Sequence, residues 1–114
     1  MALDTVEEYI SYARVLLQDT VDAPYRYPDP DLLVALSLSL LEAKKTRPDL
    51  FLGVSTIPTF SVVDNTPVPM DEMYRIALVY YMCGQAQLRD DEETQDQRAA
   101  AFLALFSSKL LTVA

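Results

Sequence analysis

The sequence predicts an all-α fold, a four-helix bundle-like domain, and three observations lead to this prediction. The 114 residues include only two glycines, and alanine, leucine and methionine lose little rotamer freedom in helices. Apolar residues recur at helical spacing in four segments. Hydrophobic residues make up 51% of the chain, which suits one domain over residues 1–114.

The first helix is expected over residues 5–18. Thr5 and Glu8 have the spacing of a capping box, in which each side chain reaches the backbone N–H of the other residue. Arg14 falls with the polar residues on the outer side. The apolar stripe contains Val6, Tyr9, Ile10, Ala13, Leu16 and Leu17.

A loop is expected over residues 19–29. It contains Tyr25 and Tyr27 on either side of Arg26. Tyrosine rings can pack while their hydroxyls stay in water, so both tyrosines are candidate protein contacts.

The second helix has the clearest start signal and is expected to end near Thr46. Asp29 is a candidate N-cap, Pro30 suits the first helical position, and Pro48 disfavours a helical residue before it. The main stripe contains Leu32, Leu33, Leu36, Leu40 and Ala43, and Leu38 and Leu41 widen it. A helix with so much apolar surface is buried on several sides or meets a second molecule, which makes Leu38 a contact candidate.

Residues 48–70 are the least regular part. A β-prone run at 60–63 precedes a turn sequence at 64–67, so this part is either a long, partly extended loop or a short β-hairpin. Both readings remain open here. Its apolar residues Phe51, Ile57 and Phe60 are further contact candidates.

The third helix is expected to begin near residues 69–71 and to run to 89, and the fourth to cover 92–111. The acidic run at 90–93 is expected to form a solvated turn that makes the two helices an antiparallel pair. Tyr80 points away from the third helix's stripe and is the last contact candidate. The two stripes contain Met73, Tyr74, Ala77, Leu78, Tyr81 and Ala86, and Ala99, Ala100, Phe102, Leu103, Phe106 and Leu110.

The chain offers few groups for catalysis. It contains no histidine, which is the commonest general base and metal ligand, and its glycines are too far apart for a phosphate loop. Cys83 is the single cysteine, so no intrachain disulfide can form, and it is expected to be a small buried hydrophobe. We therefore expect no enzyme activity, no catalytic residues, no cofactor and no metal site.

Charge and hydropathy limit the partners. The net charge of −8 disfavours autonomous binding to nucleic acid. The first residues have no signal-peptide pattern, and no apolar run approaches the ~20 residues that span a bilayer. We expect a soluble protein made in a reducing cytoplasm, with no membrane partner.

Several motifs occur in an order that resembles a known class. They are an aromatic-Arg-aromatic step at 25–27, a polar helix cap at 28–31, Arg-Pro-Asp at 47–49, and two helices that contain 74–81 and 99–102. Together they resemble the small adaptor proteins of tailed bacteriophages, the head-to-tail connector or head-completion class. Residues 44–63 depart from the pattern, because this stretch varies in length within the class.

The resemblance implies a structural role in the virion neck. Such proteins form a ring of copies of themselves, usually about twelve, and a ring needs two different faces of each subunit to meet. The implied partners are the portal protein and a tail or second connector protein, and DNA passes through the lumen only as cargo. The host cytoplasm is the implied place of synthesis.

Two other functions remain as hypotheses. One is a small cytosolic helical interaction module or regulator, which would have a soluble partner and no place in a particle. The other is an enzyme that uses carboxylates alone, which requires Asp or Glu side chains that converge in a pocket.

Overall fold

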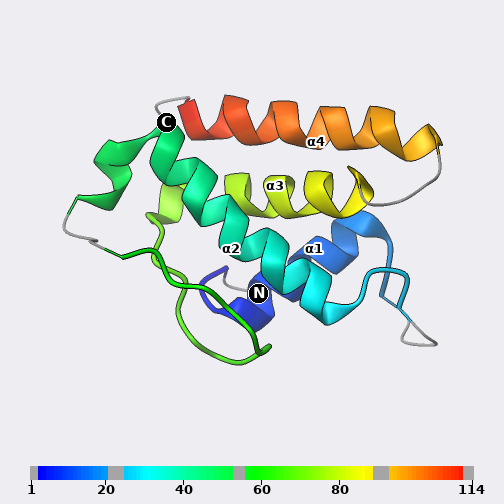
Figure 1. Cartoon of the computed structure of the whole chain (residues 1–114), viewed down its shortest axis with the longest axis horizontal. Helices are drawn as coiled ribbons and strands as arrows, with labels where there is room; N and C mark the ends of the chain where they lie inside the picture. The colour runs from blue at the N-terminus through cyan, green and yellow to red at the C-terminus, as the bar shows by residue number, and fades with distance from the viewer. Residues whose placement is uncertain (1–2, 21–24, 53–55, 89–92, 112–114) are drawn as a thin grey trace.

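The computed structural model describes residues 3–20, 25–52, 56–88 and 93–111, with side chains from 98 onward in the last range. These residues contain four α-helices and no strand: α1 (Val6–Leu17), α2 (Asp29–Thr46), α3 (Arg75–Leu88) and α4 (Glu93–Leu111) (Figure 1). Two short 3₁₀ helices, η1 (Pro48–Phe51) and η2 (Glu72–Tyr74), follow α2 and precede α3. The prediction of an all-α fold is confirmed.

The α3 helix lies in the middle of the molecule and contacts the other three helices. In Figure 1, α4 runs along α3 in the opposite direction, and α2 crosses obliquely. Because α3 has neighbours on several sides, it buries more than the single predicted stripe. The additional buried residues are Val79, Met82, Cys83, Gly84 and Gln87.

The α3 and α4 helices approach closely at Gly84. A Cβ atom added to this glycine would lie 2.8 Å from Cγ of Leu103 and 3.3 Å from the carbonyl oxygen of Ala99. The absence of a side chain at Gly84 therefore sets how near α4 comes to α3.

The start of α1 follows the predicted capping box. The Glu8 carboxylate accepts hydrogen bonds from the backbone N–H and the hydroxyl of Thr5, each at 3.0 Å. The N–H donors of Val6 and Glu7 are bonded to the carbonyl oxygens of Thr66 and Asp64, at 3.0 and 2.9 Å. The extended segment before α3 thus completes the cap of α1.

Two details of the other helix starts were predicted wrongly. Pro28, not Asp29, is the N-cap residue of α2, because its backbone is extended and its carbonyl oxygen accepts the first helical hydrogen bonds, from the N–H groups of Asp31 and Leu32. Before α3, residues 72–74 form a 3₁₀ turn, and Met73 is 54% exposed instead of lying in the core. A 3₁₀ turn has three residues per turn, which changes the direction of its side chains.

Residues 56–71 contain no helix or strand. A single antiparallel bridge joins Thr5 to Pro67, and the Asp64 side chain accepts a 3.0 Å bond from the N–H of Thr66, as in the predicted turn. Within the described part of this segment the backbone follows the loop alternative, with no β-hairpin. The predicted acidic turn at 90–93 lies largely outside the described residues.

Candidate protein-contact site

Arg14 on α1 is a buried arginine that is bonded to several groups of the loop between α1 and α2. It is only 6% exposed, although the helical pattern placed it on the polar side. Its guanidinium donates to the Asp19 carboxylate at 2.9 Å, to the carbonyl oxygen of Tyr27 at 2.8 Å and to the Asp29 carboxylate. The helical pattern placed Arg14 opposite the apolar stripe, and the following loop folds back over this side of α1 and buries it.

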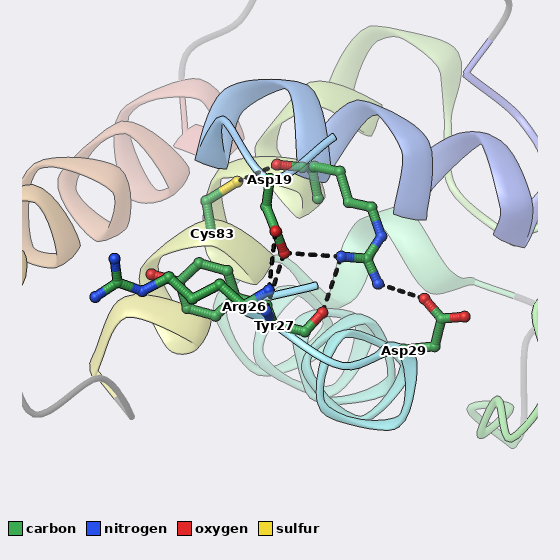
Figure 2. A network of polar contacts seen from close by, with 7 residues as sticks. Asp19, Arg26, Tyr27, Asp29 and Cys83 are labelled. Atoms are coloured by element: carbon green, nitrogen blue, oxygen red, sulfur yellow. Dashed lines mark hydrogen bonds and ion pairs between the residues drawn. The ribbon is translucent and has the colours of Figure 1, made fainter. Parts of the chain in front are cut away.

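The same network fixes the aromatic-Arg-aromatic step. The buried Asp19 carboxylate accepts the backbone N–H groups of Arg26 and Tyr27, both at 2.9 Å. The ring of Tyr25 lies against Arg14, with 3.7 Å between the ring centroid and Cζ. Figure 2 shows Asp19, Tyr27 and Asp29 joined by these contacts.

The two candidate tyrosines differ in exposure. Tyr27 is 7% exposed and belongs to the core, so its side chain has almost no surface to offer a partner. Tyr25 is partly exposed, and its outer side remains accessible. The step therefore has a clear structural role, which is to anchor the loop between α1 and α2.

Arg47 plays a similar role at the other end of α2. It forms two hydrogen bonds with the Asp49 carboxylate, at 3.0 and 2.8 Å, and donates to the carbonyl oxygen of Leu110 in α4 at 2.8 Å. Its guanidinium also lies over the Tyr74 ring, 5.2 Å from the centroid. The Arg-Pro-Asp motif thus joins the ends of α2 and α4 to the start of α3.

The candidates between residues 50 and 63 lie at different depths. Phe51 is 3% exposed and sits in the core, which corrects its prediction as a contact. Ile57 and Phe60 are partly buried against the core. The N–H of Phe60 donates to the Ser37 hydroxyl on α2 at 2.9 Å, so this segment is held against α2.

The outer side of this segment is more accessible. A shallow depression of about 210 Å³ is lined by Pro58, Thr59, Phe60, Ser61, Val62, Asp64 and Thr66. Among these lining residues, Val62 is 61% exposed. Val62 was not among the contact candidates predicted from the sequence.

Two helices carry exposed apolar surfaces that point away from α3. The α2 stripe consists of Val34, Leu38 and Leu41, which are 44%, 36% and 48% exposed. The α4 face consists of the exposed residues Ala101, Ala104, Leu105 and Leu111. Leu38 was predicted as a contact, and the spacing of Val34 and Leu41 around it would have indicated both.

Tyr80 on α3 is partly buried against the core. Its ring stacks on Phe102 of α4 with 6.2 Å between centroids, and the side chain is partly exposed. Most of its apolar surface is therefore used within the chain.

The described residues show no arrangement suited to metal binding. No group of three or more His, Cys, Asp or Glu side chains among them converges on a metal position. Burial raises the pKa of the Cys83 thiol to about 12, so it stays protonated at neutral pH. In the same described part, no helix has the length and apolar composition needed to cross a membrane.

Comparisons of the chain with models of protein families, with curated proteins and with solved structures found no match.

Proposed function

We propose that this protein is a structural component of the virion neck in a tailed bacteriophage, an adaptor ring that joins the portal to the tail or to the next connector protein. The observation that carries this proposal is the presence of two separate apolar surfaces, the α2 stripe and the α4 face, on one small subunit. A closed ring needs two different faces of each copy to meet, and two such surfaces supply them. The order of motifs in the sequence supports the same class.

In this proposal the helices form a bundle in the ring wall, and residues 56–63 form an arm toward the portal or a neighbouring copy. The net charge of −8 supports a lumen through which DNA passes without binding. Leu38, Ile57, Phe60, Val62 and Tyr25 keep accessible surface for such contacts, whereas Tyr27 and Phe51 do not.

The direct test is to locate the protein. Purified particles from cells that produce the complete set of virion proteins would be analysed by mass spectrometry and by electron microscopy with symmetry expansion at the portal vertex. We expect a ring of this chain next to the portal. Particles that have a complete neck but lack the chain would refute the proposal.

Recovery of a soluble regulator without portal or tail proteins, in an affinity pull-down, would support the interaction-module alternative instead.

Contact by the arm is tested with Val62→Asp. Val62 is exposed, so the charge should leave the free energy of unfolding unchanged and should prevent incorporation into particles. Phe60→Asp is a poorer test because Phe60 packs on the core. Val15→Asp on α1, which is also exposed, is the matched control and should still be incorporated. Normal incorporation of Val62→Asp would show that the arm makes no essential contact.

A further inference from the structure

The outward side of α2 has a regular order of side chains that extends the α2 stripe at both ends. Asp31, Val34, Leu38, Leu41 and Lys45 follow one another at alternating steps of three and four residues. This spacing places all five on one line along a helix, as in the seam of a coiled coil. Asp31 is partly exposed and Lys45 is exposed, so the line is accessible along its whole length.

The charges on this line are arranged symmetrically about Leu38. The acidic residue lies seven positions before it and the basic residue seven positions after it (38 − 31 = 7; 45 − 38 = 7). If a second copy lies antiparallel, each Asp31 faces the other copy's Lys45, and the two Leu38 side chains meet at the two-fold axis. A parallel pair would instead bring like charges together, which is unfavourable.

We propose that the α2 stripe docks against the α2 stripe of a second copy of this chain, antiparallel and about a two-fold axis at Leu38. Val34 then packs beside the partner copy's Leu41, and the apolar centre supplies most of the affinity. Exposed ion pairs are weak, so the two charge pairs mainly set the direction of pairing. Asp31 also interacts within its own chain, but a carboxylate has about four acceptor positions and can serve both contacts.

The pairing is expected to be weak. Five side chains per copy are far fewer than the ~20–30 residues per side of a standard interface. Dimers should therefore form only as protein concentration rises. The inference does not rest on the proposed function, because it concerns the free chain in solution. In a ring, the α4 face of a neighbouring copy would replace the second α2 stripe on this surface.

A charge exchange tests the direction of pairing by sedimentation equilibrium over a range of protein concentrations. Asp31→Lys and Lys45→Glu should each lower the dimer association constant about tenfold, because each places like charges opposite one another. The double variant Asp31→Lys/Lys45→Glu restores opposite charges and should recover the association constant to within about threefold. Circular dichroism must show native helicity for each variant.

A wild-type chain that stays monomeric at millimolar concentration would overturn the proposal. A folded double variant that pairs no better than the single variants would overturn the antiparallel arrangement.

Cysteine cross-linking tests the two-fold axis independently of charge. Packed helices lie ~8–10 Å apart and their Cα atoms lie ~2.3 Å from the axis, so residues on the two-fold axis are close enough for a disulfide. Under mild oxidation, Leu38→Cys should give a covalent dimer. The wild type, whose only cysteine is buried, and Val15→Cys, exposed on α1, should not.

Equal cross-linking of Leu38→Cys and Val15→Cys would mean random collision and would refute the proposal. If Leu38→Cys cross-links only when mixed with Leu105→Cys, the α2 stripe meets the α4 face instead, and the two-fold proposal fails while the ring proposal gains support.

Discussion

Arg14 is an arginine that the fold has almost completely removed from water. Its partners Asp19 and Tyr27 lie in the loop that follows α1, so one side chain holds the loop to the helix. Removal of one partner from a buried ion pair leaves the other charge buried without compensation, which costs far more than the pair itself contributes.

Replacement of Arg14 by leucine should therefore lower the free energy of unfolding by about 3–5 kcal/mol. Arg14→Lys should be intermediate, because lysine keeps the charge but lacks the planar fork. Chemical denaturation monitored by circular dichroism measures both. The control is Arg98→Leu at an exposed position of α4, which should change stability by less than about 0.5 kcal/mol. An equal effect of the two leucine variants would show that the network is not important for stability.

Glu8 links stability to pH. The backbone N–H of Thr5 holds the pKa of this carboxyl below its ordinary value of 4.5. Because the folded pKa is lower than the unfolded one, the stabilisation is complete above about pH 4.5 and is lost as pH falls through the folded pKa.

Glu8→Gln should thus lose less stability than the wild type as the pH falls below about 4.5, because glutamine has no carboxylate whose hydrogen bonds to Thr5 are lost on protonation. Denaturant unfolding at several pH values tests this. If the free energies of unfolding of the wild type and Glu8→Gln depend on pH in the same way, protonation of Glu8 does not affect folding stability.

At the scale of elements, the closest contact is between α3 and α4 at Gly84. Alanine would favour the helix by about 1 kcal/mol over glycine, but a new methyl group in a tight contact costs about 1–3 kcal/mol. The position of Leu103, 2.8 Å from the added Cβ, decides which effect is larger.

We expect Gly84→Ala to lower the free energy of unfolding by about 1 kcal/mol in the wild type. In a Leu103→Ala background the closest contact is removed and only the 3.3 Å approach of the Ala99 carbonyl oxygen remains. The same change should then raise stability by roughly 0.5 kcal/mol. The four chains form a double-mutant cycle, measured by thermal or chemical unfolding. If Gly84→Ala changes the free energy of unfolding in the same direction in both backgrounds, Leu103 is not the side chain that limits the space at Gly84.

At the scale of the whole molecule, α4 lies at one side and packs mainly on α3. Its last turn is also held by the bond from Arg47 to the carbonyl oxygen of Leu110. Elements with fewer packed neighbours open at lower free energy, so α4 should exchange its amide hydrogens faster than α3.

Arg47→Ala should speed exchange in the last turn of α4 and in η1 and leave α1 unchanged, as measured by hydrogen-exchange mass spectrometry. It should also let the pKa of Asp49, which the hydrogen bonds from Arg47 keep below 3.8, rise toward that value in an NMR titration. If amide exchange in α1 increases as much as in α4, Arg47 stabilises the whole fold and not only the contact between the ends of α2 and α4.

Local signals in the sequence are sufficient to predict where the four helices lie along the chain. Thr5 and Glu8 mark the start of α1, Pro48 marks the end of α2, and apolar periodicity reveals the segments of α3 and α4. These signals act over a few residues, and each can therefore be read without knowledge of the fold. The same pattern identified Leu38, whose exposure on α2 is consistent with a protein contact.

Only the tertiary structure determines which side chains are buried. Arg14 is buried by a loop, Phe51 and Tyr27 fill the core, and α3 is buried on most sides because three helices surround it. Burial depends on neighbours that are distant in the sequence, and periodicity reports only the orientation of a residue within its own helix. The sequence by itself thus determined an all-α protein with candidate contact residues, and the packing decided which of them remain at the surface.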